Sequence, residues 1–159
     1  MPRVKKMPDD VKQSCISLVK GYARRKREYA IKRAELMSNN SDKVITIRAG
    51  IEEKESIGVM LPGSHNASRA TENIALKMVS LEDHMDTRRM RAVEYAEGRI
   101  GMDLPEDQRK KLTKAIFTSC IQGREYPFER LCVEGMERTC FYDRRMLFLI
   151  DIAKYMDML

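Results

Sequence analysis

The segment TENIALKMVSLEDHMDTRRMRAVEYAEGR, residues 71–99, carries apolar side chains at steps of three and four residues. Such spacing places them on one side of an α-helix, as a stripe that Arg88 and Arg89 interrupt. The stripe consists of Ile74, Met78, Leu81, Met85, Ala92 and Ala96. A long helix is therefore predicted over residues 71–101, with a side suited to antiparallel packing or to self-association.

A similar pattern begins at Asp9 and runs to Asn39. Asp9 and Asp10 lie where negative charge stabilises a helix N-terminus. The apolar positions on one side are Val11, Cys15, Leu18, Tyr22, Tyr29 and Leu36. Residues 1–39 are predicted to form a basic N-terminal long helix that packs as an antiparallel pair with the helix at 71–101.

Residues 40–70 separate the two predicted helices and are the least regular part of the chain. Val44, Ile45 and Ile47 suit one short strand, and residues 57–61 suit a second. Turn-forming residues follow at 62–66. This stretch is predicted to be a linker, either a loop or a small hairpin at 43–61, and the fold class is all-α in both cases.

Residues 102–159 are predicted to form a C-terminal three-helix unit that contains a helix-turn-helix. Asp103, Pro105 and Glu106 have the spacing of an N-cap and capping box, and that helix ends at Gly123. A short helix is expected over 127–133, a turn at Gly135, and a last helix over 137–156. In this arrangement the last helix faces a DNA groove with its first turns. Its exposed residues there would be Arg138, Thr139, Tyr142, Asp143 and either Arg145 or Met146.

The segment MERTCFYDRR, residues 136–145, resembles the recognition-helix region of phage late-transcription regulators of the RinA and ArpU type. The preceding YPFERL at 126–131 is similar to their short first helix, and residues 11–29 and 71–77 look like their earlier helices. The resemblance leaves out roughly residues 40–68. It implies a sigma-region-4-like helix-turn-helix with promoter DNA as the target. The residues expected to contact DNA in this region are Arg138, Thr139, Tyr142, Arg144 and Arg145.

Positive charge is concentrated at the N-terminal end. The chain has a net charge of +6, whereas residues 1–33 alone carry eleven Lys/Arg against three acidic residues. A basic run occupies positions 24–27, as Arg24, Arg25, Lys26 and Arg27. Such a run can follow a phosphate backbone without reading sequence. The alternative is a solvated helix side, or pairing with acidic residues of the helix at 71–101.

The sequence lacks the patterns typical of enzymes, cofactor sites and metal sites. No Gly-rich phosphate loop is present, and His65 and His84 have no partner at metal-ligand spacing. The cysteines at 15, 120, 132 and 140 form no CxxC pair and are expected to be reduced thiols. A non-enzymatic protein of the host cytoplasm is predicted, with no cofactor and no membrane association.

Two functions from different classes remain open at this point. The first is a phage-type transcription regulator that reads promoter or operator DNA with its C-terminal helix and grips phosphates with its N-terminal helix. Double-stranded DNA is then the main partner, with RNA polymerase and a second copy of the chain as further candidates. The second is a phage-encoded protein-interaction module that inhibits or adapts a host protein. Asp143 favours this function. The last helix favours it too, because the charges of four acidic and four basic residues cancel between 137 and 159. A small terminase-type packaging protein is a third variant and would form rings.

Overall fold

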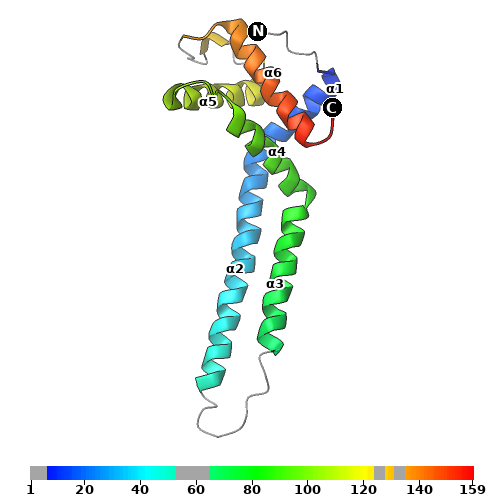
Figure 1. Ribbon diagram of the computed structural model, residues 1–159, viewed down its shortest axis with the longest axis vertical. Helices are drawn as coiled ribbons and strands as arrows, with labels where there is room; N and C mark the ends of the chain where they lie inside the picture. Colours follow the sequence, from blue (N-terminus) through cyan, green and yellow to red (C-terminus); the bar gives the residue numbers. More distant parts are fainter. Residues whose placement is uncertain (1–6, 53–64, 124–127, 131–134) are drawn as a thin grey trace. The chain divides into compact units, whose positions relative to one another are not determined.

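The computed structural model describes residues 7–52, 65–123, 128–130 and 135–159, and of residues 39–52, 65–68 and 70 it describes only the backbone. Every regular element within these ranges is helical (Figure 1), which confirms the all-α prediction. The elements are α1 (Asp9–Lys20), α2 (Tyr22–Glu52), α3 (His65–Asp83), α4 (Met85–Arg99), α5 (Glu106–Gln122), the 3-10 turn η2 (Phe128–Arg130) and α6 (Arg138–Tyr155).

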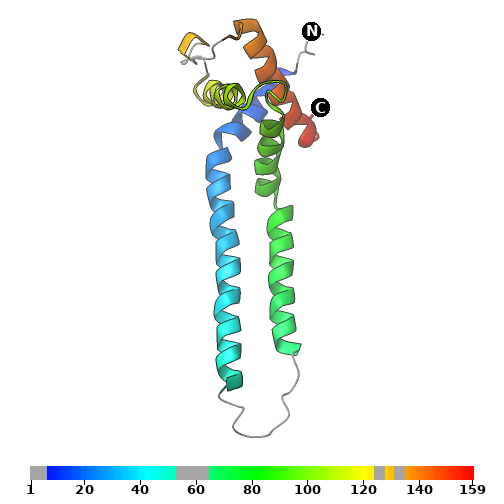
Figure 2. The same cartoon turned by 60° about the vertical axis from the view of Figure 1, so that its left-hand side comes forward.

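The chain divides into two compact units. The first, here called the body, comprises Met1–Arg25 and Arg88–Leu159. The second, here called the helix pair, comprises Lys26–Thr87. Within the helix pair, α2 and α3 lie side by side and run in opposite directions in both views (Figures 1 and 2). The prediction paired the whole of residues 1–39 with residues 71–101, whereas this unit contains only Lys26–Thr87.

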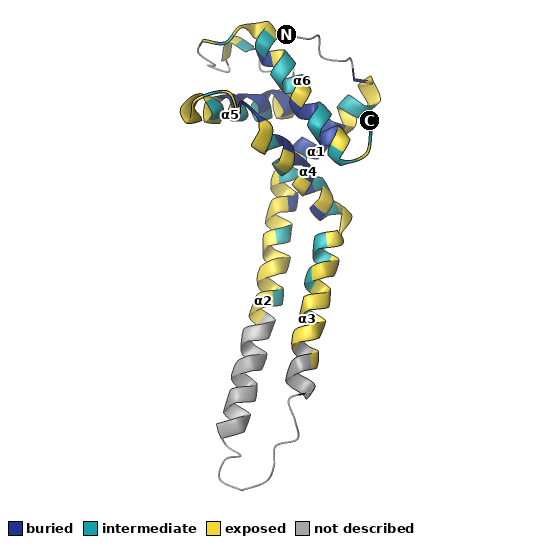
Figure 3. Ribbon diagram, viewed as in Figure 1, coloured by how far each residue is buried: buried dark blue, intermediate teal, exposed yellow. Residues whose placement is uncertain are grey.

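The core lies in the body and is built from α1, α4, α5 and α6. Figure 3 shows buried residues on each of these helices. The Phe117 ring packs in tilted orientation against the rings of Tyr22 and Phe148, with centroids 6.0 and 5.5 Å away. The largest fully buried side chains are Phe141, Phe148, Leu112, Ile116, Leu149 and Ile152. Burial of this apolar surface is the main force that holds the four helices together.

The predicted N-terminal helix is interrupted at Gly21, where α1 ends and α2 begins. The carbonyls of a last helical turn have no partner within the helix. At the end of α1, Arg25 Nη1 donates a hydrogen bond to the Leu18 carbonyl over 2.9 Å. The guanidinium lies against Gly21, so a Cβ at that position would be only 2.8 Å from Arg25 Nη2. A buried arginine thus stabilises a break that apolar periodicity does not reveal.

The predicted helix at 71–101 is likewise broken, at His84. The Thr87 hydroxyl donates to the Leu81 carbonyl over 2.7 Å, and the Asp86 N–H donates to His84 Nδ1 over 3.2 Å. These side chains bond backbone groups that a helix end leaves without partners. The apolar stripe continues across the break, and for this reason the sequence pattern resembled one helix.

The predicted hairpin at 43–61 is wrong over residues 43–52, because α2 continues as a helix to Glu52. Residues 57–61, the other predicted strand, lie outside the described residues. β-Branched residues lower helix propensity by only a few tenths of a kcal/mol. Val44, Ile45 and Ile47 therefore do not prevent a helix that is already formed from continuing.

The C-terminal region differs from its prediction in detail. Pro105 precedes α5 without a side-chain cap, so the predicted N-cap role of Asp103 is wrong. Within the predicted short helix at 127–133, the structure describes a single 3-10 turn, Phe128–Arg130. Gly135 adopts a φ of 74°, a left-handed conformation that favours glycine, as expected of the predicted turn. The last helix, α6, begins at Arg138 and ends at Tyr155.

Candidate functional site

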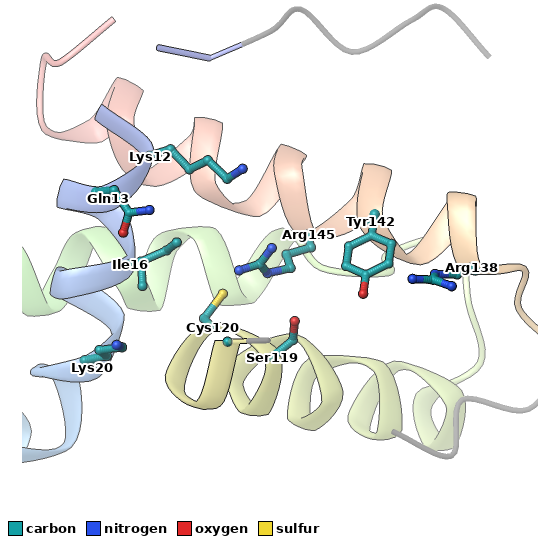
Figure 4. A pocket seen from close by; sticks show the side chains of 10 residues that line it. Lys12, Gln13, Ile16, Lys20, Ser119, Cys120, Arg138, Tyr142 and Arg145 are labelled. Atoms are coloured by element: carbon teal, nitrogen blue, oxygen red, sulfur yellow. The ribbon is translucent and has the colours of Figure 1, made fainter. Parts of the chain in front are cut away.

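A pocket of about 550 Å³ opens in the body between α1, α5 and α6 (Figure 4). Successive turns of α1 contribute Lys12, Ile16 and Lys20, because residues four apart lie on the same side of a helix. The other lining residues are Gln13, Ser119, Cys120, Gly123, Arg138, Tyr142 and Arg145. Three segments that are distant in the sequence therefore form one concave surface.

The pocket is strongly basic. Lys12 and Lys20 face it from α1, and Arg138 and Arg145 face it from α6. Among the described residues that line it, none is Asp or Glu. Glu129 lies 3.8 Å from Arg138, and both side chains are well exposed to solvent. An exposed pair of this kind interacts weakly. The arrangement is suited to an anion with several oxygens, such as a phosphate group.

Arg145 is a partly buried cation of the pocket. Its Nε is buried and has no hydrogen-bond partner among the described residues. Figure 4 shows its guanidinium group near the thiol of Cys120, which also lines the pocket. Burial raises the pKa of the Cys120 thiol, and the nearby Arg145 lowers it in part. Because the thiol stays neutral at physiological pH, it does not cancel the positive charge above it.

Cys15, in α1, is a second buried thiol of the body core. Burial and the neighbouring Cys120 raise the pKa of Cys15 to about 11. Cys15, Cys120 and Cys140 are all unpaired by disulfides, whereas Cys132 lies outside the described residues. The raised pKa values of Cys15 and Cys120 disfavour the thiolate form that a nucleophilic cysteine needs.

The residues predicted on α6 fall on different sides of the helix. Arg138, Tyr142 and Arg145 line the pocket, with the Arg138 guanidinium 5.9 Å from the centre of the Tyr142 ring. Arg144 instead forms two hydrogen bonds with Asp103, of 2.8 and 2.6 Å, and is mostly buried. Thr139 is exposed and does not line the pocket. Of the five predicted residues on this helix, three thus belong to one site.

The basic run at 24–27 is divided between the two units. Arg24 and Arg25 belong to the body, and Lys26 and Arg27 to the helix pair. Arg24, Lys26 and Arg27 are exposed, whereas Arg25 is only 9% exposed and bonds the end of α1. Arg25 therefore has a structural role that the sequence reading did not anticipate.

Lys12 and Lys20 are site residues that the sequence reading missed. Their signal is their spacing, because Lys12, Ile16 and Lys20 follow one side of a helix at intervals of four. Nothing in the sequence indicates that this side faces α6. Ser119 and Cys120, which line the pocket from α5, carry no pattern that would have marked them.

The described residues contain no group of three or more His, Cys, Asp or Glu that could hold a metal ion. In the same part of the chain, no helix is long and apolar enough to cross a membrane. Comparison with known proteins returns no matching family model, no matching curated protein and no matching solved structure.

Proposed function

We propose that the protein is a DNA-binding regulator that holds a backbone phosphate in the basic pocket of the body. The observation that carries this proposal is the convergence of Lys12, Lys20, Arg138 and Arg145 on one concave surface, whose described lining residues include no carboxylate. Phosphate contacts supply much of the affinity of proteins for nucleic acid and fix the orientation of the complex.

The beginning of α6 connects this phosphate site to base recognition. Arg138 and Thr139 form the first turn of the helix, where the helix dipole favours an anion. A phosphate beside Arg138 brings the exposed Thr139 side chain towards the adjacent groove. Arg144 has no part in this proposal because its guanidinium is bonded to Asp103.

The test is equilibrium binding to a random-sequence DNA duplex at salt concentrations from about 50 to about 200 mM. We expect affinity to fall steeply with salt, and Lys20→Ala or Arg138→Ala to reduce the slope of log K against log salt by about 1 each. Lys154→Ala is the matched control, since Lys154 is an exposed cation at the far end of α6. Absence of binding at the lowest salt, or equal effects of Lys154→Ala and Arg138→Ala, would contradict the proposal.

A second candidate, the protein-interaction module, is favoured by the outward side of α6. Thr139, Asp143 and Leu147 lie there, and Leu147 is 49% exposed. This side has an apolar and an acidic residue where a groove-reading helix usually carries cations. Leu147→Asp should leave DNA binding unchanged if the pocket is the site. It should abolish capture of a protein partner if this side is the interface.

A further inference from the structure

Where their side chains are described, the two helices of the helix pair are partly buried along one side each. Tyr29 and Leu36 on α2 are half-buried, as are Ile74, Met78 and Leu81 on α3. The Tyr29 hydroxyl is hydrogen-bonded to Glu82, which fixes the antiparallel register of the two helices. Among the described side chains of this unit, Thr87 alone is buried.

Each helix also carries a second stripe on the opposite side. On α2 the stripe consists of Arg27, Ile31, Ala34 and Ser38, and we call it the basic stripe. On α3 it consists of Glu72, Leu76, Val79 and Asp83, and we call it the acidic stripe. Both follow steps of four, three and four residues, the spacing of a helix–helix contact.

Both stripes are exposed to solvent (Figure 3). Ile31 is 51% exposed, Leu76 61% and Val79 57%. Long helices in proteins derive most of their stability from packing of an apolar side. A helix pair with one half-buried seam has little such packing. A further layer of helix against these stripes would supply the missing burial.

The two stripes are complementary in antiparallel orientation, which is also the orientation of α2 and α3 within one chain. When the two helices are aligned so that Arg27 lies opposite Asp83, Ile31 lies opposite Val79 and Ala34 lies opposite Leu76. A cation faces a carboxylate, and a small side chain faces a large one, as interdigitating helices require. The chain therefore carries both surfaces of one helix–helix contact. A second copy of the same chain can cover either stripe with its own complementary stripe.

We propose that copies of this protein associate by packing the basic stripe on α2 of one copy against the acidic stripe on α3 of the next. The contact joins two different surfaces, so each copy retains one unused stripe after a first contact. Such a head-to-tail contact produces a ring or a chain of copies rather than a closed two-fold dimer.

The test is sedimentation velocity of the full chain over a series of protein concentrations. The wild type should form species larger than a dimer. Arg27→Asp should weaken association by about tenfold or more, because two carboxylates then face each other. The double variant Arg27→Asp/Asp83→Arg should restore association, since it exchanges the two charges without changing the register.

Lys32→Asp is the matched control, because Lys32 is an exposed cation on the same helix but outside the basic stripe. It should associate like the wild type, and circular dichroism should show equal helix content in all variants. A monomer at every concentration, a species fixed at two copies, or failure of the charge exchange to restore association would overturn the proposal.

Discussion

Asp103 and Arg144 form the best-defined ion pair of the body. Arg144 donates two hydrogen bonds to the Asp103 carboxylate, at 2.8 and 2.6 Å. These bonds lower the pKa of Asp103 from 3.8 to about 2, and the same contact raises the pKa of Arg144. The pair links the segment before α5 to α6, and it explains why Arg144 does not line the pocket with Arg138 and Arg145.

The ion pair makes a prediction for the pH dependence of stability. A carboxyl whose pKa is lower in the folded state stabilises the fold above its unfolded pKa, and this contribution disappears as the pH falls through the folded pKa. Asp103→Asn should therefore lower the thermal unfolding midpoint at neutral pH. The difference from the wild type should shrink as the pH falls from 3.8 towards about 2. A difference that stays constant over this range would contradict the assignment.

At the scale of the element, α6 has two chemically distinct sides. Phe141, Phe148, Leu149, Ile152 and Ala153 are buried on one side. The other side presents Thr139, Asp143 and Leu147 to solvent or leaves them partly exposed. Arg138, Tyr142 and Arg145 border the buried side near the start of the helix, which is why they reach the pocket. One helix thus serves both the core and the candidate site.

Adjacent residues of α6 test this division. Phe148→Ala should destabilise the protein by about 3–5 kcal/mol, because it removes a ring that is 2% exposed and packs against Phe117. Leu147→Ala should cost no more than about 0.5 kcal/mol, because that side chain already faces solvent in large part. Urea unfolding of the two variants provides the comparison. Equal losses would mean that α6 is rotated relative to the orientation described here.

For the whole molecule, the hydrophobic core belongs to the body. Its buried residues all fall between Met7 and Val19 or between Ala92 and Ala153. Among the described side chains of the helix pair, none belongs to this cluster. The body therefore contains the features of an independently folding unit, a continuous core closed by four helices.

Replacement of residues 26–87 by a flexible linker of about ten residues tests this independence. The shortened protein should unfold cooperatively in urea, with a lower m-value that reflects the smaller surface exposed. The full chain under the same conditions is the reference. A broad transition without cooperativity would show that the body needs the helix pair in order to fold.

The helical class and most helix positions could be predicted because periodicity is a local property of the sequence. The breaks at Gly21 and His84 could not, since they depend on Arg25 and Thr87 bonding the ends of preceding helices. Nor could α2 be followed beyond Asn39, because residues 40–52 carry mixed helix and strand preferences that continuation of the helix overrides.

For the candidate site, the sequence identified Arg138, Tyr142 and Arg145 as exposed candidates on one helix, and all three line the pocket. It did not identify Lys12 and Lys20, because their role requires α1 to pack beside α6. The sequence also did not distinguish Arg25 and Arg144 from the neighbouring basic residues. In the structure each of the two side chains is hydrogen-bonded to a specific partner.

The sequence by itself therefore determined the all-helical class, the apolar sides of the helices and the positions of the charged residues. These features follow from the spacing of residues along the chain, which determines the sides of each helix independently of the other helices. The pocket, the buried arginines and the assembly of the core from the two ends of the chain were decided by tertiary packing. Contacts between residues more than a hundred positions apart, such as Lys12 with the α6 side of the pocket, depend on helix docking, and local patterns do not encode it.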